Sequence, residues 1–66
     1  MLLIDYVVEL LKDGGWHFIR NIAKELNQPE QEILGILKFC EEFNIVAFDE
    51  SGSRVRIDEK FGRLLE

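Results

Sequence analysis

The side chains of this chain that could carry chemistry are few and lie far apart in the sequence. There is one histidine, His17, and one cysteine, Cys40, and the two serines are Ser51 and Ser53. A zinc site normally needs three or four protein ligands, which one histidine and one cysteine do not supply. Nucleophilic hydrolysis needs a base and an orienting group within reach, but both serines fall in a stretch of turn composition. We therefore predict that the protein is not an enzyme and uses no metal and no cofactor.

Cys40 and His17 are better explained by structure than by reactivity. Cys40 follows Ile33 and Leu37 at helical spacing, so we expect it to be buried and slow to react. His17 lies in the short aromatic segment 16–18, where a partly exposed loop histidine is the simplest interpretation. The glycines form no phosphate-binding motif, and the carboxylates are spread over expected helix surfaces and turns.

Length and composition narrow the class of protein. A chain of 66 residues has room for one domain, residues 1–66, and a hydrophobic content of 47% indicates a packed core rather than disorder. A single cysteine excludes an internal disulfide, and no apolar run approaches the ~18 residues of a membrane span. The first residues lack the basic region of a signal peptide, so we expect a cytoplasmic protein without membrane contact.

The charge balance is acidic. A net charge of −5 argues against indiscriminate binding to nucleic acid or to an anionic membrane. It does not exclude a local basic patch, so the positions of the eight lysines and arginines matter more than their number.

Hydrophobic periodicity predicts four helices and three short strands. We expect helices at Leu2–Asp13, Ile19–Leu26, Glu30–Phe43 and Glu59–Leu65, and strands at 16–18, 45–48 and 54–57. Asn27 suits a left-handed residue that ends the second helix, and Pro29 suits the first position of the third. Two helices joined by so short a turn form a helix-turn-helix. Gly14 and Gly15 end the first helix, and Asp58 is a good N-cap for the last one.

The expected third helix divides its side chains between two faces. The inward face is centred on Ile33, Leu37, Cys40 and Asn44, and is widened by Ile36, Phe39 and Phe43 on one flank and by Leu34 on the other. The outward face carries Gln31, Gly35, Lys38 and Glu42. In the last strand alternation places Val55 and Ile57 inward, and Arg54 and Arg56 outward.

The order helix, strand, helix, helix, strand, strand resembles the winged helix-turn-helix family of DNA-binding domains, of the small prokaryotic transcription-regulator type. The resemblance covers essentially the whole chain and is most specific at Ile33, Leu37, Cys40, Asn44, Ile45 and Val46. Family members usually have leucine where Cys40 stands and glycine where Asn44 stands, and both replacements are physically compatible. The segment Arg56–Leu65 also looks like the strand-to-helix exit of these regulators. The resemblance implies an α+β, mostly α fold with a three-helix core, a C-terminal β-hairpin wing and a short last helix.

The resemblance further implies that helix 30–43 enters the major groove and that the wing lies along the backbone or minor groove. The residues it would place on DNA are Arg20, Lys24, Gln31, Lys38, Arg54 and Arg56. Gln31 could read adenine and Lys38 guanine or phosphate, but Glu42 would repel phosphate, so we expect weak direct base readout. The basic side chains suit phosphate contacts, which position a protein without specifying sequence. The alternative is a set of solvated charges that guard an exposed hairpin edge.

Two functions follow from the resemblance. The first is a DNA-binding protein of the transcription-regulator type, which contacts duplex DNA. The alternative is a winged helix that mediates protein–protein contact in a transcription or assembly complex. The wing arginines favour the first, whereas the acidic balance and the apolar edge of helix 30–43 favour the second.

The first helix carries more apolar surface than a monomer needs. Its apolar arc spans roughly 200° at 100° per residue, about twice the stripe of a surface helix. Leu3, Val7 and Leu10, with Tyr6, are enough to cover the next two helices. We therefore expect a homodimer through the remaining residues of the first and last helices, Ile4, Val8, Leu11, Leu64 and Leu65. The alternative is that Trp16, Phe18 and Phe61 fold over this strip within one monomer.

Overall fold

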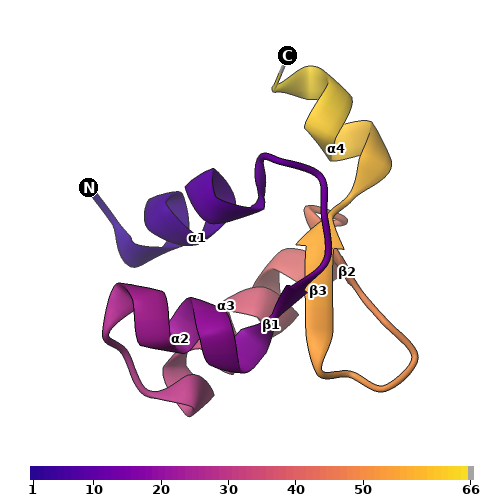
Figure 1. Cartoon of the computed structure of the whole chain (residues 1–66). Helices are drawn as coiled ribbons and strands as arrows, with labels where there is room; N and C mark the ends of the chain where they lie inside the picture. The colour runs from indigo at the N-terminus through magenta and orange to yellow at the C-terminus, as the bar shows by residue number, and fades with distance from the viewer. Residues whose placement is uncertain (66) are drawn as a thin grey trace.

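The computed structural model describes residues 1–65, which form four helices and three short strands (Figure 1). In chain order these are α1 (Leu3–Leu11), β1 (His17–Phe18), α2 (Ile19–Leu26), α3 (Glu30–Glu42), β2 (Val46–Phe48), β3 (Arg54–Ile57) and α4 (Glu59–Leu64). The predicted class, α+β and mostly helical, is confirmed, and several elements are one to three residues shorter than expected. None of the helices within residues 1–65 is long and apolar enough to cross a membrane.

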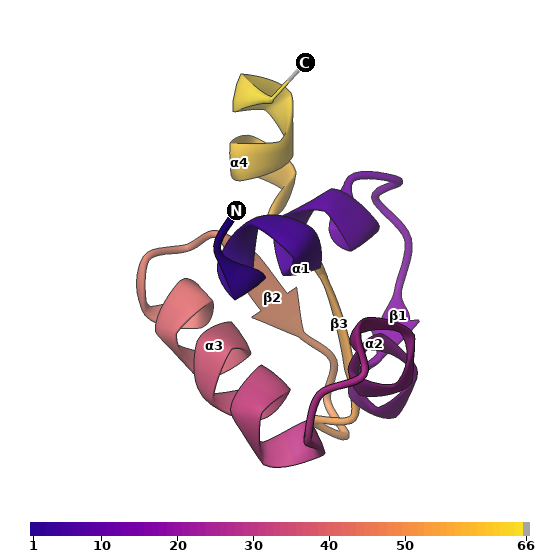
Figure 2. The same cartoon turned by 90° about the vertical axis from the view of Figure 1, so that its left-hand side faces the viewer.

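The three strands form one antiparallel sheet in the order β1-β3-β2. β3 is central: His17 and Phe18 of β1 face Val55 and Arg54, and Val46, Ala47 and Phe48 of β2 face Ile57, Arg56 and Val55. β1 is far from β3 in the sequence, so this pairing closes the chain around its core. Figure 2 shows α1, α2 and α3 gathered on one side of the β2–β3 hairpin.

The predicted turns and caps are confirmed at Asn27 and Asp58 and corrected at Pro29. Asn27 has φ 54° and ends α2, with the Gln28 N–H donating to the Ala23 carbonyl at 2.9 Å. Asn44 also adopts a left-handed conformation, with φ 58°, directly after α3. The Asp58 carboxylate caps α4 by accepting from the N–H groups of two residues of its first turn. Pro29 is the N-cap residue of α3 rather than its first helical residue.

The core lies where the three larger helices meet the inner face of the sheet. Its most buried side chains are Val7, Leu11, Ile22, Ile33, Leu37, Cys40 and Val55. Val55 and Ile57 point inward from β3, as the alternation predicts. Cys40 is fully buried among apolar side chains, and this burial raises the pKa of its thiol.

The structure corrects the prediction for α1. Val7 and Leu11 are both fully buried, so Leu11 belongs to the monomer core and is not part of an exposed interface. Ile4 and Val8 are partly buried and pack against the same core, as do Leu3 and Leu10. The centre of the buried arc is rotated relative to the prediction, because helix α1 also packs against β3 and not only against α2.

The inward flank predicted for α3 is also wrong in part. Phe39 and Phe43 keep 49% and 63% of their surface exposed. Their rings meet edge to face, with centroids 4.9 Å apart. They therefore form an exposed aromatic pair near the C-terminal end of α3 rather than part of the core.

α4 projects away from the rest of the molecule at the end of β3, as both ribbon views show (Figures 1 and 2). None of its residues, Glu59–Leu64, is fully buried, although Phe61 packs against the core. Gly62 allows this approach, because a Cβ there would lie 3.2 Å from Ile57 Cγ2. Leu64 and Leu65 are 81% and 43% exposed, so this end of the chain presents apolar side chains to solvent.

Candidate functional site

The outer face of the sheet carries two aromatic and two arginine side chains, which we call the aromatic–arginine face: Trp16, Phe18, Arg54 and Arg56. Phe18 is paired with Arg54 across the β1–β3 ladder, and continuing this register places Trp16 opposite Arg56. The Arg54 guanidinium carbon lies 5.7 Å from the Trp16 ring centroid and 5.9 Å from that of Phe18. That of Arg56 lies 5.4 Å from Trp16. These are cation–π distances, so the arginines and the aromatic rings stabilise one another's positions.

This cluster was not predicted from the sequence. The signal was present as two alternating pairs, Trp16 with Phe18 and Arg54 with Arg56. Only the pairing of β1 with β3, which no local pattern specifies, brings them together. The alternative prediction that Trp16 and Phe18 fold over α1 is wrong, because their rings lie against the arginines and stay 43% and 44% exposed.

Arg54 is held by the turn that connects β2 to β3. Its Nε donates to Asp49 Oδ2 at 2.8 Å, and the guanidinium holds the pKa of that carboxyl well below its usual range. Asp49 Oδ1 also accepts from Ser51 Oγ at 2.9 Å and from the Ser53 and Arg54 N–H groups at 3.2 Å. Both serines thus have a structural role in the turn.

Arg56 differs from Arg54 in its charge balance. The ion pairs of lysine and arginine within residues 1–65 join Arg54 to Asp49, Arg63 to Glu59 and Lys12 to Glu9, and they leave Arg56 without a carboxylate partner. Arg20 and Lys24 are likewise outside these pairs, and both are exposed on α2. Lys38 on α3 and Lys60 on α4 are outside these pairs as well, so the unpaired positive charge is spread over α2, α3, β3 and α4.

A groove of about 480 Å³ runs between the β2–β3 turn and the first turns of α2 and α3. Phe18, Arg20, Gln31 and Ser53 are among its lining residues, so it joins three of the expected contact elements. Glu30 lines it as well and opposes a negatively charged ligand at that end. Arg20 and Lys24 line a neighbouring hollow with the turn between α2 and α3.

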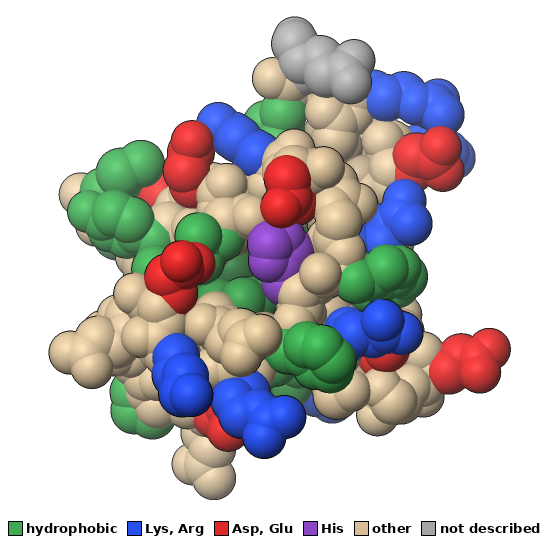
Figure 3. All heavy atoms as spheres, in the orientation of Figure 1, with side chains coloured by type: hydrophobic (Ala, Val, Ile, Leu, Met, Phe, Trp, Pro, Cys, Tyr) green, Lys and Arg blue, Asp and Glu red, His purple; other side chains and the backbone are tan. Residues whose placement is uncertain are grey.

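Figure 3 shows how charge is arranged on this side of the molecule. Lysine and arginine side chains, in blue, lie over α2, over the sheet and over α4, with hydrophobic side chains between those of α2 and the sheet. The exposed surface of α3 has the opposite character, since four of its residues are glutamates and one is a lysine: Glu30, Glu32, Glu41, Glu42 and Lys38. Of the basic residues predicted to meet DNA, Arg20 and Lys24 lie on α2 and line one hollow, and Arg54 and Arg56 share the outer face of β3. Lys38 instead lies on the acidic α3.

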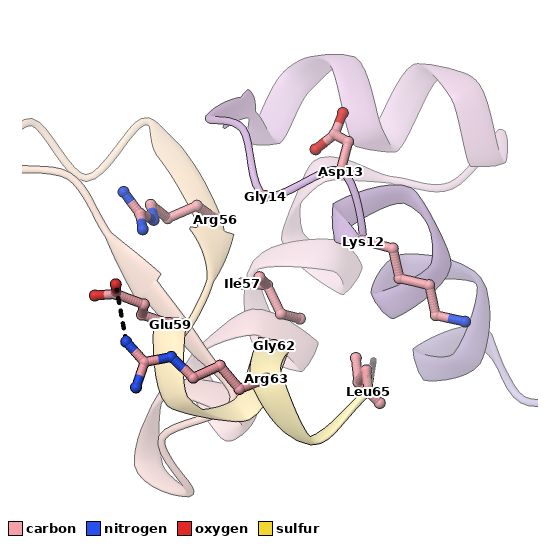
Figure 4. A pocket seen from close by; sticks show the side chains of 9 residues that line it. All are labelled: Lys12, Asp13, Gly14, Arg56, Ile57, Glu59, Gly62, Arg63 and Leu65. Carbon is pink, nitrogen blue, oxygen red and sulfur yellow. Dashed lines mark hydrogen bonds and ion pairs between the residues drawn. The ribbon is translucent and has the colours of Figure 1, made fainter.

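A second hollow, of about 410 Å³, lies between the end of α1 and the base of α4 (Figure 4). Its basic residues do not converge on a common point, because Lys12 and Arg56 point to opposite sides in Figure 4. Arg63 is engaged by Glu59, with 3.3 Å between Nη2 and Oε1. This hollow is therefore a poor anion site.

His17 belongs to β1 and is paired, which the sequence did not reveal. Its Nε2 lies 2.9 Å from Asp13 Oδ1, and the same oxygen accepts from the Gly15 N–H at 2.9 Å. The hydrogen bond from His17, with that from Gly15, lowers the pKa of Asp13. The Asp13–His17 pair stabilises the turn between α1 and β1. No group of three or more metal-ligating side chains occurs within the described part of the chain.

Comparison with known proteins found no match: no protein-family model, no curated protein and no solved structure is similar to this chain.

Proposed function

We propose that this protein is a winged-helix, nucleic-acid-binding domain of the transcription-regulator type that holds duplex DNA mainly by its phosphates. In this proposal α2 and α3 form the helix-turn-helix and the β2–β3 hairpin is the wing. The observation that carries it is unpaired positive charge at the groove between the β2–β3 turn and the helices. Arg20 lines this groove and Lys24 the neighbouring hollow, and neither has an ion-pair partner among residues 1–65. Arg54 and Arg56 add two guanidinium groups on the outer face of β3.

Contacts of this kind position a protein without reading sequence. The acidic surface of α3 opposes its deep insertion into the major groove, because glutamates there would face phosphates. Gln31, at the start of α3 and in the groove, is the residue best placed to reach a base edge. We therefore expect the domain to have a weak sequence preference, with its affinity for DNA supplied by arginines on the wing and α2.

Salt dependence of duplex binding tests this proposal. Each phosphate contact contributes about −0.9 to the slope of log K against log salt concentration, so three or four contacts give roughly −3 to −4. Arg56→Ala is expected to weaken binding and reduce the slope by about 0.9. Lys12→Ala is the matched control, because Lys12 is paired with Glu9 and points away from Arg56. Absence of binding at low salt would overturn the proposal, and an unchanged slope in Arg56→Ala would overturn the role of the wing.

The Lys38→Ala variant separates the wing from α3. If α3 does not enter the major groove of the DNA, this variant should bind duplex DNA about as well as wild type. A loss equal to that of Arg56→Ala would show that α3 contacts the backbone directly.

The exposed aromatic pair favours a second candidate, a winged helix used for protein–protein contact. Phe39 and Phe43 are exposed next to Glu41 and Glu42, which suits a partner with an apolar pocket and a basic rim. This candidate replaces the first if no nucleic acid binds at low salt. Phe43→Ser would then abolish partner binding while leaving far-UV circular dichroism unchanged.

A further inference from the structure

Trp16 and Phe18 contribute little to the core, yet neighbouring arginines and the pairing of β1 with β3 hold both side chains in place. Both rings stay more than two-fifths exposed, and each has a guanidinium within 6 Å of its centroid. Phe18 lies on a strand paired with the centre of the sheet, and Trp16 directly precedes it. Each ring is therefore held beside a guanidinium group and still presents more than two-fifths of its surface to solvent.

The spacing of the rings favours an unpaired strand over a duplex. Residues two apart on a strand are separated by about 7 Å. Successive nucleotides in one strand of a duplex rise only about 3.4 Å, and both faces of each base are covered by its neighbours. Only a strand stretched out of duplex geometry could place successive bases on both rings.

A hollow of about 680 Å³ lies directly against this surface, bounded by Trp16, Phe18 and Arg54 on one side and by the β2–β3 turn on the other. The turn contributes two carboxylates, Asp49, which is paired with Arg54, and Glu50, so the phosphates must lie away from this end. Aromatic side chains beside cations are the usual combination for single-stranded nucleic acid, because every base has a π face and every nucleotide a phosphate. Arg56 has no carboxylate partner among residues 1–65, so its charge is available to a phosphate.

We propose that Trp16 and Phe18 are a stacking platform for unpaired bases of single-stranded DNA, with Arg56 and Arg20 holding the adjacent phosphates. The inference rests on the proposed function for these phosphate contacts. It adds that the ligand includes an unpaired stretch, such as the single-stranded part of a duplex with an overhang.

Trp16 provides a direct readout, because it is the single tryptophan of the chain. Titration of the full chain with a short oligothymidine should quench its fluorescence to a saturable limit. Phe18→Leu keeps an apolar side chain but removes the π face, so oligothymidine affinity should fall by about tenfold relative to blunt-duplex affinity. Phe39→Leu is the control, since it removes an exposed aromatic ring on α3 and should change neither affinity.

Five outcomes decide the inference. Quenching of Trp16 by oligothymidine, together with the loss in Phe18→Leu, supports the platform. Oligothymidine binding that leaves Trp16 fluorescence and the Phe18→Leu variant unaffected overturns it. Binding of blunt duplex without oligothymidine overturns the platform but leaves the proposed function intact, and binding of neither overturns both. Tighter binding of oligouridine than of oligothymidine overturns the assignment to DNA.

Discussion

Asp49 shows how one carboxylate both builds the turn and restrains the site. It accepts hydrogen bonds from the Arg54 side chain and from the Ser53 and Arg54 backbone, and it balances the charge of Arg54. The same side chain therefore stabilises the hairpin and weakens the attraction of Arg54 for phosphate. Stability and binding are opposed at this residue.

The Asp49→Asn variant should separate these two effects. The domain is expected to lose stability, because the ion pair to Arg54 is gone. Duplex affinity should rise and the salt slope should steepen by about 0.9, since one more arginine is free to contact phosphate. Thermal melts and salt titrations measure the two quantities. A fall in both would mean that Asp49 acts on binding only by shaping the turn.

The pH dependence of this variant has a defined sign. The pKa of Asp49 is depressed in the folded state, so its contribution is complete above the unfolded value of about 3.9 and is lost as pH falls toward the folded value. The difference in stability between wild type and Asp49→Asn should therefore be constant near neutral pH and shrink below about pH 4. Denaturant melts across that range check it. A difference that grows on acidification would contradict the assignment.

Cys40 was placed correctly by helical spacing alone. Its side chain is fully buried and the pKa of its thiol is raised, so labelling by a thiol reagent should be much slower than in denaturant. Cys40→Ser should cost about 1–3 kcal/mol in the free energy of unfolding, because a buried hydroxyl needs a partner. Cys40→Ala removes the sulfur without adding a hydroxyl and should cost less. Equal costs would indicate that the serine finds a hydrogen bond.

At the scale of elements, α3 combines a well-packed inner face with an acidic outer face. Gly35 lies in the middle of the helix on its exposed face. Apart from its chain neighbours and the backbone of α3 itself, no atom of the described residues lies within 4 Å of where its Cβ would be. Gly35→Ala should therefore stabilise the domain by about 0.5–1 kcal/mol, because alanine loses less backbone entropy in a helix. Duplex affinity should not change if the sheet and α2 carry the contacts. A marked loss of affinity would show close approach of DNA to α3.

At the scale of the whole molecule, the projecting α4 carries what is left of the predicted dimer surface. Leu11 is buried and Ile4 and Val8 are partly covered, but Leu64 and Leu65 remain exposed. We propose that two copies associate through α4 and the uncovered side of α1. A homodimer would set two wings against one duplex and offset the weak affinity of each.

Light scattering at micromolar concentration tests this association. Wild type should have twice the 7.7 kDa of one chain, and Leu64→Glu should be monomeric with unchanged helicity. Phe43→Glu places the same charge on the other exposed apolar site and should remain dimeric. A mass near 7.7 kDa at every concentration would rule the dimer out.

Features that depend on near neighbours in the chain could be predicted from the sequence alone. The two left-handed asparagines, Asn27 and Asn44, the Asp58 cap and the helical and alternating periods all follow from local backbone preferences. The inward direction of Val55 was predicted in the same way, because alternation along a strand does not depend on which side chains pack against that strand.

Contacts between segments that are distant in the sequence could not be predicted and are seen only in the folded structure. A helical wheel gives the width of an apolar arc but not where its neighbours lie, so it misplaced Leu11 and left Phe39 inside. The Asp13–His17 pair spans a turn whose geometry depends on Gly14, at φ 78°. The aromatic–arginine face exists because β1 pairs with β3 across most of the chain, and that long-range register is set by packing of the whole core rather than by any local preference.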